Sequence, residues 1–102
     1  MTGDVKFCAI LTMRYMNKSL MQSCHDYIAS HMPPPPKGLI AMRSFHIAPD
    51  RGMSLCYFDT NENLNDAFPS MKEFQQRVAA KFEAKADAQK AITSSQSDFG
   101  DC

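Results

Sequence analysis

The amino-acid sequence predicts an α+β domain in which two helices cover one face of a small antiparallel sheet. Three observations lead to this prediction. Apolar residues alternate with period two in some segments, they recur every three or four positions in others, and turn-forming or capping residues separate these segments. The 102 residues suffice for one domain with one modest core, so we expect a single domain over residues 1–102.

The first part of the chain predicts a strand followed by a helix. In Val5 to Met16, one of the two alternating sets of residues is wholly apolar or aromatic. Asn17 is a suitable N-cap because its side chain can accept a hydrogen bond from a free backbone amide. A helical stripe follows and must end before Pro33, since proline disfavours a helical residue ahead of it; the stripe comprises Leu20, Cys24, Tyr27, Ile28 and His31.

The segment HMPPPPKG, residues 31–38, predicts a stiff extended connector. Recognition of its prolines by an aromatic-groove domain is the less favoured alternative. Gly38 then opens a second strand, in which we expect one face to carry Leu39, Ala41, Arg43, Phe45 and Ile47, and the other Ile40, Met42, Ser44, His46 and Ala48. APDRG predicts a hairpin turn that leads into a third strand, Met53 to Asp59.

Asp59, Thr60 and Asn61 supply capping chemistry for a second helix, and we expect Pro69 to mark a first helical turn. The apolar stripe of this helix comprises Met71, Phe74, Val78 and Phe82. From about residue 84 the chain is polar, and residues 91–99 suit either a weak fourth strand or a helical extension with a loose tail. The order is therefore β-α-β-β-α-(β), the ferredoxin-like pattern of an antiparallel sheet with both helices on one face.

Charge and composition argue against a nucleic-acid partner. Lys plus Arg and Asp plus Glu each number 11, so the formal net charge is zero, whereas nucleic-acid binding usually needs a basic surface. RGMSLCYF, residues 51–58, matches an RNA-recognition signature at Arg51, Gly52 and Phe58. The two signature positions on which bases stack hold Met53 and Leu55, which have no aromatic ring.

We expect neither a membrane span nor a metal site. The sequence has no apolar run of the roughly 18 residues that a spanning helix needs, and its start lacks a signal-peptide layout, which predicts a cytoplasmic protein. No cysteine pair has the CxxC spacing of a zinc site. We therefore expect Cys8, Cys24 and Cys56 to be buried thiols, and Cys102 to be exposed at the chain end.

The three clear strands carry apolar side chains on both faces, although two helices can cover only one. A stable monomer rarely exposes such a face, so the pattern predicts a homodimer that packs sheet against sheet. KFCAILTMRY and the stretch GLIAMRSFHIAPDRGMSLCYFDTNENLNDAF with PSMKEF resemble the dimeric α+β barrel superfamily, and within it the antibiotic-biosynthesis-monooxygenase-like group. The resemblance covers roughly residues 5–83, and the polar tail departs from the apolar final strand usual in the family.

This resemblance implies a homodimer with a pocket beside each sheet. Members of the superfamily include cofactor-independent monooxygenases that act on polycyclic aromatics, haem-degrading enzymes and isomerases. The haem-degrading branch uses an Asn, a Trp and a His. Leu11 and Phe58 stand at the first two positions here, the stretch MKEFQQRVAAKF has no histidine, and the chain has no Trp, so we expect no haem degradation and no cofactor.

His46 is the candidate catalytic residue, because a neutral imidazole on a strand can accept or relay a proton. Tyr57 and Tyr15 are candidates to orient a ligand through their hydroxyls, and Arg14 and Arg43 to bind an anionic substituent. Packing or salt-bridge roles are the alternative for all of these residues. We expect His25 and His31, on the first helix, to be structural.

Two functions remain open at this stage. The first is a dimeric monooxygenase-like enzyme that binds a small apolar or aromatic molecule and activates it by deprotonation. The second is a non-catalytic dimer that serves as a binding or interaction module. A solvent-open pocket that holds His46 near Tyr57 favours the first, and a pocket filled by methionine and phenylalanine favours the second.

Overall fold

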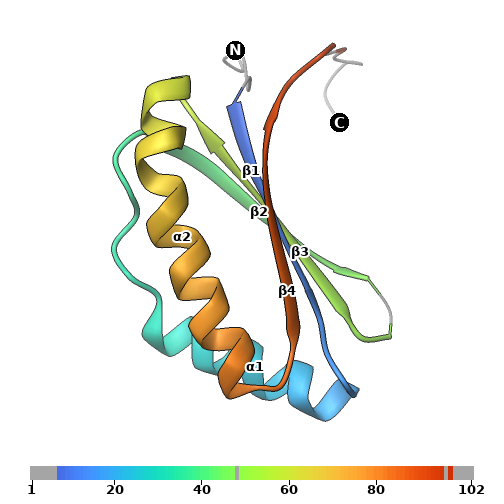
Figure 1. Cartoon of the computed structure of the whole chain (residues 1–102). Helices are drawn as coiled ribbons and strands as arrows, with labels where there is room; N and C mark the ends of the chain where they lie inside the picture. The colour runs from blue at the N-terminus through green and yellow to red at the C-terminus, as the bar shows by residue number, and fades with distance from the viewer. Residues whose placement is uncertain (1–6, 48, 96, 98–102) are drawn as a thin grey trace.

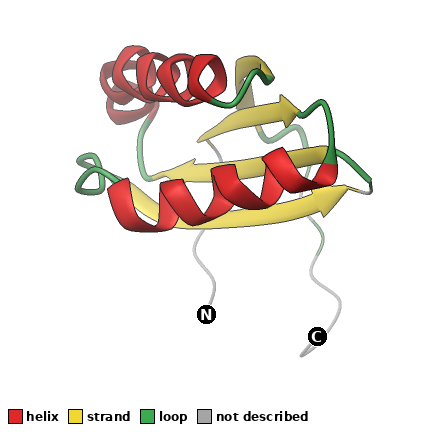
Figure 2. Ribbon diagram, turned by 90° about the horizontal axis from the view of Figure 1, so that it is seen from below, coloured by secondary structure: helices red, strands yellow, loops and turns green. Residues whose placement is uncertain are grey.

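The computed structural model describes residues 7–47, 49–95 and 97. Its elements, in chain order, are β1 (Phe7–Arg14), α1 (Lys18–His31), β2 (Leu39–Ile47), β3 (Arg51–Phe58), α2 (Asn61–Lys81) and β4 (Lys85–Ile92). The four strands form one antiparallel sheet in the order β2-β3-β1-β4. Both helices lie on the same side of this sheet (Figures 1 and 2), so the predicted ferredoxin-like fold is confirmed.

The strand register determines which side chains point toward the helices. Ala9 of β1 lies opposite Cys56 of β3, and both are almost fully buried beneath the helices. The next residue, Ile10, lies opposite Leu55 and points to the other side. We call the two sides the helix face and the open face.

Two groups of buried residues form the core between the helix face and the helices. One group joins β1, α1 and α2 and comprises Met13, Tyr15, Met21, Cys24, Val78 and Ala79. The other joins β1, β3 and the first half of α2 and comprises Ala9, Cys56, Phe58, Leu64 and Ala67. Full burial of a large apolar side chain such as Phe58 contributes about 1.5–3 kcal/mol.

The predicted N-caps are present in the structure. The Asn17 side chain accepts a hydrogen bond from the Leu20 amide at 2.8 Å, and the Thr60 hydroxyl accepts one from the Asn63 amide at 3.0 Å. The prediction that Pro69 marks a first helical turn is wrong, because α2 begins at Asn61 and continues through Pro69. Apolar contacts on both sides of the proline hold the helix together, since Leu64 and Ala67 are buried before it and Val78 and Ala79 after it. Within the described residues, no helix is long and apolar enough to cross a membrane.

A fourth strand exists, but at different residues from those predicted. β4 runs from Lys85 to Ile92 and pairs with β1, whereas the expectation was residues 91–99. Ala86 and Ala88 alternate with exposed residues and are half-buried on the helix face. Alanine favours helices and is depleted in strands, so the sequence pattern concealed a strand that pairing with β1 stabilises. Residues 96, 98 and 99 of the predicted strand lie outside the described residues.

The proline connector reaches β2 through Gly38, which has a φ of 85°. A Cβ on Gly38 would lie 2.5 Å from the Asp59 carboxylate and 2.5 Å from the Asn63 amide, so only glycine fits there. An irregularity in pairing follows immediately, because Leu39 lies opposite Phe58 and Ala41 opposite Tyr57. Leu39 therefore packs against the helix-side core, and the prediction that it shares a face with Ala41 is wrong.

Candidate ligand-binding surfaces on the two faces of the sheet

The helix face is left uncovered along β2. Met42, Ser44 and His46 lie on this face, opposite Cys56, Ser54 and Gly52, yet all three are exposed. The longer helix, α2, contacts β1, β4 and β3. We call these three β2 residues the helix-side strip. The Ser44 hydroxyl of this strip lies 3.0 Å from the Ser54 hydroxyl of β3.

His46 lies at the end of this strip, opposite Gly52 of β3, and two rings approach Gly52 from the helix side. A Cβ on Gly52 would lie 3.8 Å from the His25 Nε2 and 4.0 Å from the Tyr15 ring. The Tyr15 and His25 rings meet edge to face, with centroids 6.0 Å apart. Gly52, the neighbour of His46 across the strands, is therefore also the point where His25 of α1 approaches the sheet. This placement of His25 was missed at the sequence level, because α1 and β3 are far apart in the chain.

Tyr15 is part of the core. Its side chain is 4% exposed, and its hydroxyl points between the Met13 Sδ at 3.2 Å and the Cys24 Sγ at 3.3 Å. Burial raises the pKa of this phenol, and the neighbouring Cys24 thiol raises it further. A hydroxyl held between two sulfur atoms in the core is not free to bind a ligand.

The other predicted binding residues lie on the open face. Tyr57 is opposite Cys8 and Ala41, Arg43 is opposite Leu55, and Arg14 is opposite Arg51 and Lys85. The structure thus brings Arg14, Arg43 and Tyr57 to one face and places His46 and Tyr15 on the other. Within one protomer, His46 and Tyr57 do not share a pocket.

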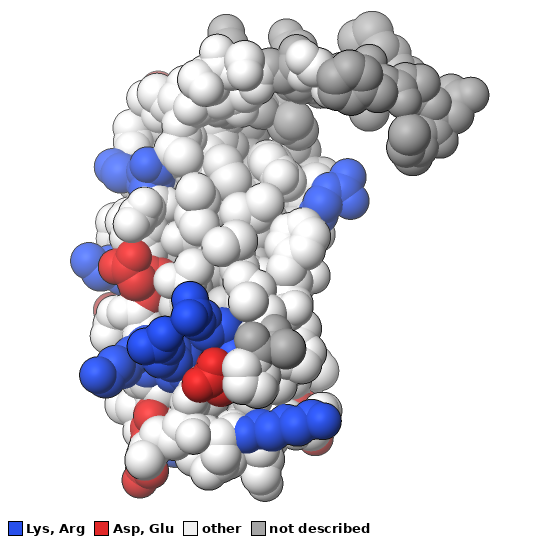
Figure 3. All heavy atoms as spheres, turned by 90° about the vertical axis from the view of Figure 1, so that its right-hand side faces the viewer, with Lys and Arg blue, Asp and Glu red and all other residues white. Residues whose placement is uncertain are grey.

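The open face is apolar at its centre and basic toward one end. Phe45 is 48% exposed and Ile47 is 40% exposed, and the half-buried side chains of Ile10, Met53 and Leu55 continue this surface across β1 and β3. Figure 3 shows a broad region without charged side chains, below which Lys and Arg side chains gather. No helix of the described chain covers this face (Figure 1).

A shallow pocket of about 330 Å³ lies at the basic end of the open face. Three cations line it, Arg14, Arg51 and Lys85, together with Asp87 and apolar side chains that include Ile47 and Met53. Of the cations, only Arg14 was a sequence candidate. The sequence pattern assigns Arg51 to the APDRG turn and leaves Lys85 in the polar stretch after residue 84, so it does not bring the three cations together.

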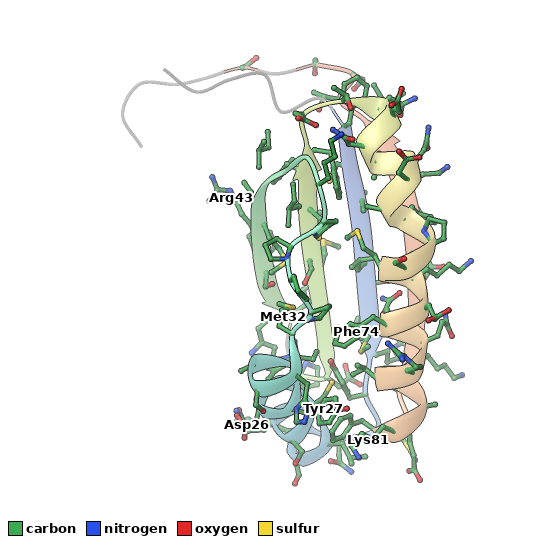
Figure 4. All side chains as sticks on the ribbon, turned by 90° about the vertical axis from the view of Figure 1, so that its left-hand side faces the viewer. Asp26, Tyr27, Met32, Arg43, Phe74 and Lys81 are labelled. Atoms are coloured by element: carbon green, nitrogen blue, oxygen red, sulfur yellow. The ribbon has the colours of Figure 1, made fainter. Side chains whose placement is uncertain are left out.

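A second pocket, of about 270 Å³, lies between the two helices. Its walls include Tyr27 and His31 of α1 and Phe74 and Arg77 of α2. Tyr27, Phe74 and Lys81 lie close together where the helices approach one another (Figure 4). The His31 ring stacks on Tyr27 with centroids 4.0 Å apart, and the imidazole Nδ1 is 2.9 Å from the Tyr27 carbonyl. These contacts support the structural role expected of His31.

The three described cysteines, Cys8, Cys24 and Cys56, are buried free thiols, as the sequence predicts; Cys102 lies outside the described residues. Burial raises the pKa of each thiol, and it raises that of Cys56 to about 11. No cluster of three or more His, Cys, Asp or Glu side chains suited to a metal ion occurs among the described residues.

The sequence matches no family model, and no curated protein matches it. The fold of this chain does resemble that of several solved structures. A dimeric ferredoxin-like protein from an uncultured marine organism superposes with a TM-score of 0.72 at 12% identity, over 92% of this chain and 100% of that chain. The ActVA-Orf6 monooxygenase of Streptomyces coelicolor, in complex with nanaomycin D, superposes with a TM-score of 0.71 at 9% identity, over 90% of each chain.

SnoaB, a cofactor-independent oxygenase from Streptomyces nogalater, superposes with a TM-score of 0.54 at 5% identity, over 96% of this chain and 100% of that chain. These likenesses confirm the fold that the sequence resemblance implied. At such low identity, similar folds host different chemistry, so function has to be argued from the surfaces described above.

Proposed function

We propose that the protein acts as a homodimer in which two open faces pack against each other. The observation that carries this proposal is the apolar centre of the open face, where Ile10, Leu55 and Phe45 lie on neighbouring strands with no helix above them. Contiguous apolar surface of this kind marks an interaction site in a soluble protein. The name of the marine structure, a dimeric ferredoxin-like protein, supports the same arrangement.

The reaction class we propose is cofactor-independent monooxygenation of a small apolar or aromatic molecule. Two structures with this fold, the ActVA-Orf6 protein and SnoaB, are a monooxygenase and a cofactor-independent oxygenase. In such a reaction, an activated CH₂ group of the substrate reacts with O₂ and becomes a carbonyl group, and the second oxygen atom leaves as water. All four electrons come from the substrate, so the reaction needs no external reductant.

His46 is the proposed base. It is exposed on the helix-side strip, opposite Gly52 of β3. Removal of one substrate proton gives a carbanion that can transfer an electron to O₂, which a neutral substrate does far less readily. General base catalysis of this kind typically contributes a factor of about 10²–10⁴ in rate.

The remaining candidates divide by face. Tyr57, Arg14 and Arg43 are proposed to contact ligand groups that reach the open face, and Tyr15 is proposed to support His25 through their edge contact rather than to touch the ligand.

A cytoplasmic location is also part of this proposal. The free state of the three buried cysteines supports it, because thiols persist in reducing compartments.

Oxygen uptake with a tricyclic anthrone as the probe substrate tests the proposed reaction. We expect wild-type protein to consume O₂ in proportion to the carbonyl product formed, and His46→Ala to slow turnover by about 10²-fold or more. His31→Ala is the matched control, because it removes another exposed histidine of the same chain. Equal rates for wild type and His46→Ala, with both variants folded, would remove His46 from the mechanism.

One observation favours the alternative, a non-catalytic binding or interaction dimer. His46 and Tyr57 lie on opposite faces, and Tyr15 is locked in the core, so the predicted base and its positioning groups do not converge within a protomer. A dimer that binds the anthrone without consuming O₂ would establish this alternative.

A further inference from the structure

The open face ends in a row of three cations on three adjacent strands. The register sets Arg14 of β1 opposite Arg51 of β3 on one side and opposite Lys85 of β4 on the other. All three line the same pocket. Because neighbouring strands lie about 4.8 Å apart, three positive charges are held along a short line.

The fold itself does not neutralise this row. Among the described residues, no carboxylate lies within ion-pairing distance of any of the three cations. The carboxylate in the pocket wall, Asp87, accepts a hydrogen bond from the Gln89 side chain at 3.2 Å instead. Like charges directly opposite each other destabilise a sheet. The stability of the protomer therefore does not account for the presence of three cations in this row.

The pocket has the dimensions and chemistry of a small-anion site. Its volume of about 330 Å³ lies at the lower end of the range for ligand sites. The three cations and Asp87 together carry a net charge of +2. Arginine guanidinium groups present paired N–H donors that match the geometry of carboxylate and phosphate oxygens. Ile47 and Met53 add an apolar wall beside these donors.

We infer that this pocket binds the oxyanion group of a small organic molecule, a phosphate or a carboxylate, whose apolar body rests against Ile47 and Met53. The bound anion offsets the repulsion among Arg14, Arg51 and Lys85. The site depends neither on turnover nor on the dimer. The apolar Ile10–Leu55 pair lies four residues up the strands from the Arg14–Arg51 pair, about 13 Å away, so packing of two open faces at that centre leaves the row near the margin.

Titration of the full-length protein with inorganic phosphate, and separately with benzoate, tests the site. Backbone amide NMR shifts are followed at constant ionic strength, with chloride as the reference anion. We expect saturable shifts centred on Arg14, Arg51 and Lys85, and no saturation with chloride. Arg14→Gln is expected to weaken binding about tenfold, because one of three charge-assisted contacts is lost. Lys85→Gln, on a different strand, should weaken it as well.

Lys72→Gln is the matched control, since Lys72 is an exposed cation of α2 that lies outside this pocket. Tighter binding of phosphate identifies a phosphate-bearing ligand, and tighter binding of benzoate identifies an aromatic carboxylate. Several results would overturn the inference: shifts that chloride reproduces, equal weakening by Lys72→Gln, or no weakening by either Arg14→Gln or Lys85→Gln. Binding of an oligonucleotide that strengthens with its length would overturn the small-molecule assignment. None of these readouts requires O₂ consumption, so failure here is distinguishable from failure of the proposed reaction.

Discussion

The helix face and the open face of this sheet are built from alternate residues of the same strands, yet their environments differ completely. On β3, Phe58 is fully buried beneath α2, whereas its neighbour Tyr57 is only half-buried on the open face. On β1, Ala9 is fully buried, whereas Ile10 is partly exposed although it is the larger and more apolar residue. Except along β2, the helices therefore bury the apolar side chains of the helix face, whereas the apolar side chains of the open face remain partly exposed in the protomer and are those that the proposed dimer would cover.

Replacement of Phe58 and Tyr57 by alanine gives the largest expected effects and tests this difference directly. Phe58→Ala should lower the free energy of unfolding by about 3–5 kcal/mol, since it removes a fully buried ring and leaves a cavity. In a monomer at high dilution, Tyr57→Ala should cost much less. Urea unfolding at low protein concentration measures both.

The same two variants then need comparison at high protein concentration. If the open face is covered in a dimer, the cost of Tyr57→Ala should rise with concentration while that of Phe58→Ala stays constant. Equal costs for the two variants at every concentration would show that the faces do not differ as described.

A charge placed on the open face should separate the protomers. Leu55→Asp puts a carboxylate at the apolar centre of this face, where an unpaired buried charge is costly, and we expect at least a hundredfold rise in the dimer dissociation constant, about 3 kcal/mol. Light scattering over a dilution series measures the mass, which should be near twice 11.4 kDa for the wild type.

Ser44→Asp is the control for this experiment, because it adds the same charge on the exposed helix-side strip. It should leave the mass unchanged. A wild-type mass of one protomer at all concentrations would refute the dimer and leave the open face as a surface for a different partner.

The sequence predicted the order of elements because period-two and helical patterns depend on which residues are buried. It located β1, α1, β2 and β3 to within a few residues. It failed at β4, where alanine supplies the helix-face residues, and at Pro69, where contacts on both sides override a local preference. Both errors arise where tertiary packing outweighs intrinsic propensity.

The sites were less predictable than the fold. His46 and Tyr57 are each candidate site residues because of their side-chain chemistry, but the strand register places them on opposite faces of the sheet. Arg14, Arg51 and Lys85 come from three strands, and only the pairing of β1 with both β3 and β4 assembles them. Sequence patterns report the environment of a single residue well, whereas a site depends on which distant residues become neighbours.

Alkaline unfolding gives the smallest expected effect and compares one thiol from each face. Burial raises the pKa of Cys56, on the helix face, to about 11, above the value of about 8.5 for a thiol in the unfolded chain. The folded state therefore holds this proton more tightly, and the stability that results is fully present below about pH 8.5 and is lost as pH rises toward 11. We expect the Cys56 contribution to fall by about 2–3 kcal/mol across this window.

Burial raises the pKa of Cys8, on the open face, as well, so Cys8→Ala is the matched comparison for Cys56→Ala in urea unfolding from pH 7 to 11. At low protein concentration, Cys56→Ala should flatten the pH dependence more than Cys8→Ala does. If Cys8→Ala flattens it equally under these conditions, the open face excludes water at Cys8 as well as the helix face does at Cys56, and the two faces do not differ at this end of the sheet.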